Sequence, residues 1–116
     1  MKHLALYLCV FSAPLLLGQS SAAAEKSGPR FETEVRSILK AHCWQCHGEA
    51  DEKKGGLDTR LARFLIKGGE SGPAIVPGKH ADSRLFKRVA SGEMPPGAKR
   101  LSARDVEVLA RWIDAG

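Results

Sequence analysis

The sequence has few cysteines, few aromatic residues and no long apolar run, and each shortage excludes a class of protein. Three cysteines in 116 residues cannot all pair, which disfavours a disulfide framework. The longest mostly apolar run, residues 4–17, is shorter than the roughly 20 residues that cross a bilayer. No basic stripe carries the aromatic residues that stack on bases, so we expect no nucleic-acid partner. No segment shows sustained period-two alternation, so we expect an all-α protein.

The first 24 residues have the pattern of a secretion signal. Lys2 supplies a basic start, residues 4–17 form an apolar segment, and residues 22–24 are three alanines that suit a signal peptidase. We predict cleavage after Ala24, a periplasmic or equivalent extracytoplasmic location, and no stable membrane span in the mature chain. An uncleaved anchor is the alternative. Cleavage would also remove Cys9.

The two cysteines that then remain belong to the motif Cys43-Trp-Gln-Cys46-His47. Two thiols with two residues between them, followed at once by an imidazole, are typical of covalent attachment of a c-type haem. We therefore predict that Cys43 and Cys46 bind the haem and that His47 ligates its iron. A thiol-disulfide oxidoreductase would need a strand-helix-strand frame, which the pattern does not show. A structural zinc site would need a second ligand pair, and none has the proper spacing.

Met94 is the candidate for the second iron ligand. It is the only methionine left after the signal is removed, and it lies in the proline-fixed stretch 94–96 rather than on an apolar helix face. His42 and His80 are alternative ligands. Ligation by His47 and Met94 would close the coordination sphere, which suits an electron carrier without substrate chemistry of its own.

Apolar spacing predicts four helices, preceded by a flexible lead over residues 25–30. The first covers residues 31–42 and runs into Cys43. A short second helix carries Leu61 and Leu65, with Asp58 or Thr59 as its cap. The third begins at residue 82 or 83 and ends before residue 92, the last begins at residue 102, and the stretch from 70 to 79 is expected to be an ordered but irregular loop.

The order of these features resembles class I cytochrome c, and the details look like the planctomycete-type cytochrome c domain. The resemblance covers residues 31–116. It rests on five segments, which run from Cys43 to Gly48, Lys54 to Asp58, Gly68 to Gly78, Met94 to Pro96 and Arg111 to Gly116.

This resemblance implies a small all-α, class I cytochrome c-like domain of three to five helices, with long loops around one covalent haem c. It implies attachment through Cys43 and Cys46 and iron ligation by His47 and Met94. By the same similarity, the Pro73 carbonyl would accept the Nδ1 proton of His47 and so fix the imidazole ring. A simple tight turn at residues 72–73 is the alternative.

We therefore expect electron transfer between redox partner proteins that the sequence does not identify. The alternative implied by the family is that the chain is the N-terminal haem-binding module of a larger secreted redox enzyme. The net charge is only mildly positive, which is typical of a solvated surface, although it could also steer the domain towards an acidic partner.

Overall fold

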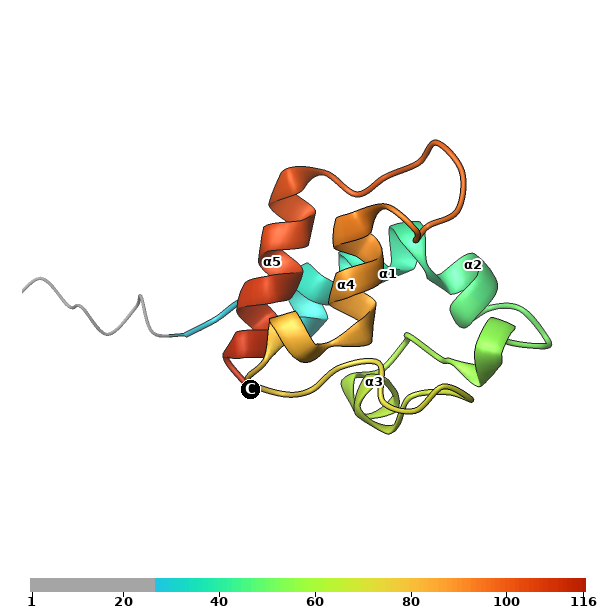
Figure 1. Ribbon diagram of the computed structural model, residues 1–116, viewed down its shortest axis with the longest axis horizontal. Coiled ribbons are helices and arrows are strands. Elements are labelled where there is room, and N and C mark those ends of the chain that lie inside the picture. Colours follow the sequence, from blue (N-terminus) through green and yellow to red (C-terminus); the bar gives the residue numbers. More distant parts are fainter. Residues whose placement is uncertain (1–26) are drawn as a thin grey trace, which may run out of the picture.

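The computed structural model describes residues 27–116, and this part of the chain is helical (Figure 1). It contains five α-helices and no strand, apart from an isolated bridge between Gly69 and Gly72. The predicted all-α class and the three to five helices that the resemblance implied are therefore confirmed. The predicted signal peptide, residues 1–24, lies outside the described residues. Among residues 27–116, no helix combines the length and the apolar character that a membrane crossing requires.

Eight helical elements follow one another along the chain. They are η2 (Phe31–Val35), α1 (Arg36–His42), α2 (Trp44–His47), η3 (Lys54–Gly56), α3 (Ala62–Lys67), η4 (His80–Asp82), α4 (Arg84–Ser91) and α5 (Ala103–Asp114). The predicted first helix is confirmed, although its first turn, η2, is a π-helix. Cys43 interrupts the helix with φ −122°, after which α2 continues the chain as a separate turn.

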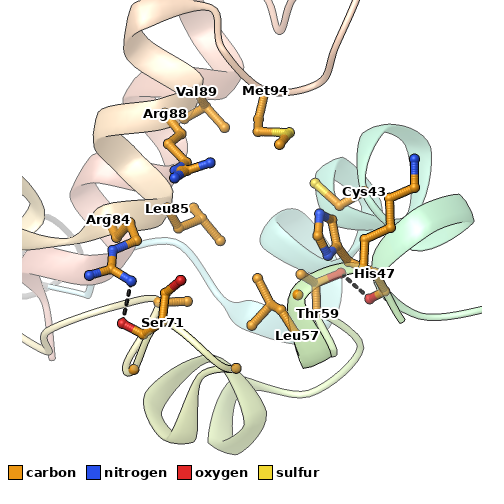
Figure 2. Close-up of a pocket in the computed structure, with 15 residues that line it drawn as sticks. Cys43, His47, Leu57, Thr59, Ser71, Arg84, Leu85, Arg88, Val89 and Met94 are labelled. Atoms are coloured by element: carbon orange, nitrogen blue, oxygen red, sulfur yellow. Dashed lines mark hydrogen bonds between the residues drawn. The ribbon is translucent and has the colours of Figure 1, made fainter. Parts of the chain in front are cut away.

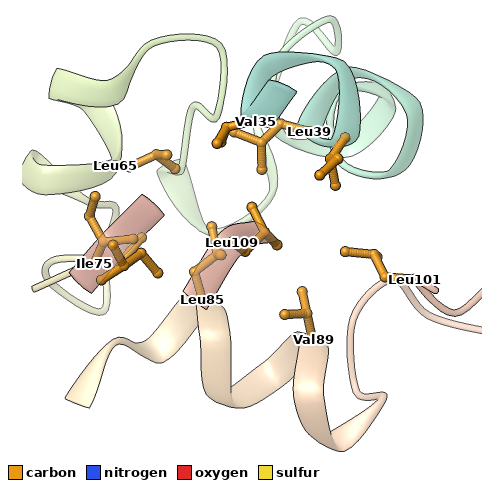
Figure 3. Packing of buried hydrophobic residues seen from close by; sticks show 11 residues of the cluster. Val35, Leu39, Leu65, Ile75, Leu85, Val89, Leu101 and Leu109 are labelled. Carbon is orange, nitrogen blue, oxygen red and sulfur yellow. The ribbon is translucent and has the colours of Figure 1, made fainter. Parts of the chain in front are cut away.

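The hydrophobic core lies where α5 packs across η2 and α4 (Figure 3). Val35, Leu39 and Leu109 are at most 1% exposed. The ring centroids of Phe31 and Trp112 lie 5.3 Å apart, where η2 and α5 are in contact. Each of these elements presents apolar residues on one face only, so the core forms only where the faces meet.

Two of the predicted helix starts are confirmed, and their serines act differently. Ser102 caps α5, because its Oγ accepts a hydrogen bond from the Asp105 N–H at 3.1 Å. Ser83 occupies the N-cap position of α4 but does not cap it. Its hydroxyl instead accepts from the Val76 N–H and donates to the Lys79 carbonyl, each at 2.9 Å. Ser83 therefore fixes the preceding loop against α4.

The predicted cap of the short helix was wrong. Helix α3 begins at Ala62, and the residue before it, Leu61, is extended and makes no side-chain cap. Asp58 instead binds Arg60, and Thr59 binds the carbonyl of His47. Both candidate side chains are therefore bound to other groups, and both residues lie three or more positions before the first residue of α3.

The loop that follows α3 is irregular but held by hydrogen bonds, as predicted. The Ala74 N–H donates to the Leu65 carbonyl at 2.9 Å, and the Gly78 N–H donates to the Ile113 carbonyl at 2.7 Å. Gly68 begins this loop with φ +76°, and a Cβ there would lie only 1.9 Å from the Gly72 carbonyl oxygen. Only glycine permits this approach, which brings the loop back beside α3.

Candidate haem-binding site

A pocket opens between the Cys43–His47 segment, α4 and the loop that follows α3 (Figure 2). Its empty space, which includes the open mouth, is about 730 Å³. Leu57, Ala74, Leu85 and Val89 contribute apolar surface to its lining. The pocket therefore suits a ligand with a large apolar body.

Three of the predicted site residues line this one pocket. Cys43 and His47 come from the first half of the described chain, and Met94 comes from the connection between α4 and α5 (Figure 2). The Met94 N–H donates to the Arg88 carbonyl at 3.1 Å, so the end of α4 sets the position of Met94. Cys46 is half-buried and is not among the lining residues.

Thr59 holds His47 in place. Its hydroxyl and its backbone N–H both donate to the His47 carbonyl oxygen, at 2.9 and 2.8 Å. Thr59 is 2% exposed and lines the same pocket. Sequence reasoning considered Thr59 only as a helix cap, since no spacing rule relates two residues that are 12 positions apart.

The imidazole of His47 has a buried nitrogen, Nδ1, without a hydrogen-bond partner among the described residues. The predicted hydrogen bond to the Pro73 carbonyl is thus not formed in this structure. Both neighbours of Pro73, Gly72 and Ala74, line the pocket. The role of Pro73 therefore stays a prediction.

Burial raises the pKa of the Cys43 thiol to about 11. The thiol is therefore neutral at physiological pH. Cysteines that exchange disulfides have the opposite property, a pKa lowered by nearby positive charge. The Cys43 environment, like the all-α fold, disfavours the thiol-disulfide alternative.

The two other histidines of residues 27–116 do not line the pocket. His80 is bound to Asp114 twice. Its ring Nδ1 lies 2.7 Å from Asp114 Oδ2, and its backbone N–H donates to Asp114 Oδ1 at 2.9 Å. These hydrogen bonds lower the pKa of the Asp114 carboxyl. His42 is half-buried at the end of α1. For the zinc alternative, residues 27–116 hold no group of three histidine, cysteine or acidic side chains that could bind a metal.

Sequence reasoning missed the cationic part of the pocket. Lys54, Arg84 and Arg88 line it, although the sequence suggested only a solvated basic surface. Arg84 Nη1 donates a hydrogen bond to the Ser71 carbonyl oxygen (Figure 2). This bond connects α4 to the loop that follows α3. The sequence does place Arg84 and Arg88 four residues apart on a predicted helix, so that their side chains are neighbours. This spacing does not show which surface of the protein the two side chains face.

These residues fit a haem of the c type. A thiol, an imidazole and a thioether meet at one apolar pocket, and they are the groups that attach this haem and ligate its iron. A small all-α domain with such a site has the form of a cytochrome c domain.

Comparison with known families gives the same class. Residues 43–97 match the family model described as Planctomycete cytochrome C. The resemblance seen in the sequence is thus confirmed over this stretch, which includes all five predicted site residues, and haem c is the cofactor that this family implies. Neither the curated proteins nor the solved structures include a match.

Proposed function

We propose that this chain is a mono-haem c-type cytochrome domain that transfers single electrons. Cys43 and Cys46 hold the haem covalently, and His47 and Met94 ligate its iron. The observation that carries the proposal is the meeting of Cys43, His47 and Met94 at one apolar pocket, although Met94 is far from the motif in sequence.

Attachment uses the chemistry of the two thiols. Each thiol adds across a vinyl group, so that the sulfur bonds to one vinyl carbon and the proton passes to the other. This addition leaves the overall oxidation state unchanged. The haem, when bound, supplies the one-electron chemistry.

The protein contributes ligands, orientation and a partly dry environment. Thr59 orients the His47 backbone, and the end of α4 positions Met94. A thioether ligand and an apolar pocket both favour ferrous iron over ferric iron, so the potential should exceed that of a bis-histidine haem. Ligation of the iron by both His47 and Met94 would leave no position for a substrate, as expected of a carrier.

The predicted export signal supports an extracytoplasmic location, which is typical of cytochrome c domains. The electron donor and acceptor are redox proteins whose identity neither the fold nor the family indicates. In the alternative, the same domain passes electrons within a larger secreted redox enzyme. Both alternatives assign the same roles to the haem and to its four protein contacts.

The test is spectroscopic. Protein purified from a host with haem-ligation machinery should be red, should keep its haem in acidified acetone, and should show when oxidised the weak far-red absorption of a thioether bound to ferric iron. Met94→Ala should abolish that band while the haem stays attached. His80→Ala is the matched control, because His80 lies outside the pocket, and it should keep the band.

Two results would contradict this proposal at different points. Colourless protein with two free thiols at Cys43 and Cys46 would exclude the cytochrome assignment. Red protein whose far-red band survives Met94→Ala would exclude Met94 as the ligand but leave covalent haem binding intact.

A further inference from the structure

The charged side chains that line the pocket are all positive. Lys54, Arg84 and Arg88 are among the 15 residues that line it, and none of the 15 is acidic. A pocket that combines an apolar wall with a cationic lining suits a ligand that has an apolar body and anionic groups.

Two of these cations share one face of α4. Arg84 and Arg88 are four residues apart, so their side chains are neighbours and repel each other. Leu85 and Val89, each one residue further along, are buried in the core and line the pocket too. Helix α4 therefore presents apolar and cationic side chains to the same pocket, opposite Cys43 and His47 (Figure 2).

Neither guanidinium group is saturated by the contacts that the structure shows. Arg84 donates one hydrogen bond, from Nη1 to the Ser71 carbonyl oxygen. Arg88 forms an ion pair with Glu93, in which Nε lies 3.8 Å from Oε2, beyond hydrogen-bond distance. A guanidinium has five N–H donors in a planar fork that matches a carboxylate. Both arginines therefore keep donors for an anionic partner.

We propose that Arg84 and Arg88 bind the propionate carboxylates of the haem. This inference rests on the proposed function, because it assumes that haem occupies the pocket. Haem has the required chemistry, since it joins a large apolar ring to two carboxylates. The apolar wall accepts the ring, and the guanidinium groups pair with the carboxylates.

Such binding affects the reduction potential. Reduction adds a negative charge to the haem, and paired cations offset both this charge and that of the propionates. Loss of either arginine should therefore lower the potential.

The experiment uses the haem-loaded protein and glutamine variants, which remove the charge but keep a polar side chain. Arg84→Gln and Arg88→Gln should each lower the potential and shift the propionate bending band in the resonance Raman spectrum, and the double variant should do both to a larger extent. Arg88→Lys should restore part of the potential. Lys87→Gln is the matched control, because Lys87 is an exposed cation of the same helix outside the pocket lining, and neither measurement should change.

The Raman band separates contact from distant charge. A lower potential with an unshifted band in the double variant would overturn the proposal, because a charge acting through space would explain it. Effects confined to Lys54→Gln would also overturn it. Arg88→Gln tests the proposal without disturbing the Arg84 contact to the Ser71 loop. A failure of the proposed function itself would appear earlier, as wild-type protein without covalent haem.

Discussion

Thr59 shows how a single residue outside the motif can govern the site. It donates two hydrogen bonds to the carbonyl of His47, and it is almost completely buried. The hydroxyl bond can be removed by Thr59→Val, which keeps the shape of the side chain and the backbone bond.

We expect Thr59→Val to destabilise the protein by about 1 kcal/mol, the net contribution of one hydrogen bond, because the backbone N–H still donates to the His47 carbonyl. In the haem-loaded protein the far-red band should also weaken or broaden, because the His47 backbone is held less firmly. Urea unfolding and absorption spectra would measure the two effects. Thr33→Val, at an exposed position of η2, is the control and should change neither. Equal effects of the two variants would contradict the positioning role.

A second residue-scale prediction concerns acid stability. The side-chain hydrogen bond from Arg60 is the main cause of the lowered pKa of Asp58, and the two side chains approach to 2.7 Å. A carboxyl whose pKa is lower in the folded state stabilises the protein above its unfolded pKa, near 3.9, and loses this contribution as pH falls through the lower folded value. Arg60 is 43% exposed, so solvent screens the pair and we expect its contribution to stability to be small.

Arg60→Gln should therefore reduce the free energy of unfolding near neutral pH and bring the variant and wild type together as the pH falls through the lowered pKa of Asp58 in the folded state. Urea unfolding at several pH values would measure this convergence. Lys67→Gln, an exposed cation of α3, is the control. A destabilisation by Arg60→Gln that stays constant down to low pH would show that the Asp58 carboxylate is not its source.

At the scale of elements, the loop after α3 depends on close backbone contacts. Gly68 has a positive φ and also faces the Gly72 carbonyl at a distance that excludes any side chain. Gly78 also has a positive φ, +83°, but open space surrounds the place of its Cβ. A comparison of alanine substitutions at the two glycines therefore separates the free-energy cost of a steric clash from that of the left-handed backbone conformation.

We expect Gly78→Ala to destabilise the protein by about 1–2 kcal/mol, the cost of a left-handed residue with a side chain. Gly68→Ala should cost about 3 kcal/mol or more, because the clash is added to the strain. Thermal unfolding of both variants would measure the difference. Similar losses for the two would mean that the loop can move away from Gly68.

The cap of α5 is a second feature at this scale. Ser102→Ala removes the side-chain acceptor for the Asp105 N–H and should cost about 1 kcal/mol. Ser37→Ala, within α1, is the control, since its hydroxyl lies 3.5 Å from the Thr33 carbonyl and alanine is the better helix former. Urea unfolding should show a loss for Ser102→Ala alone.

For the whole molecule, the small size of the protein core suggests that the haem contributes to the fold. Eleven buried hydrophobic residues form the core of the described chain, and the apolar pocket lies beside them. A covalently bound cofactor that fills this pocket would extend the apolar core and add to its stability.

We therefore expect protein produced without haem-ligation machinery to have lower helicity and a broader thermal transition than haem-loaded protein, as measured by far-ultraviolet circular dichroism. Haem-loaded Met94→Ala is the control, because it should keep the covalent bonds and most of the stability. An unloaded chain that melts like the loaded one would contradict a structural role for the haem.

The accuracy of the sequence-based predictions depended on the range of the interactions. The starts of α4 and α5 were predicted correctly, because caps and apolar spacing act within a few residues. The cap of α3 was wrong, because Asp58 and Thr59 had competing partners, and one of them is distant in sequence. The interruption at Cys43 was also not predicted.

The sequence by itself determined the attachment motif at Cys43 to His47, the thioether of Met94 in its proline-fixed stretch and the helical class, because these depend on residue type and local spacing. Only the tertiary structure decided that Met94 lines the same pocket as Cys43 and His47 and that Arg84 and Arg88 supply its positive charge. The physical reason is that such contacts join segments tens of residues apart. Their positions follow from the packing of α5 against η2 and α4 and from loop hydrogen bonds, which no local pattern encodes.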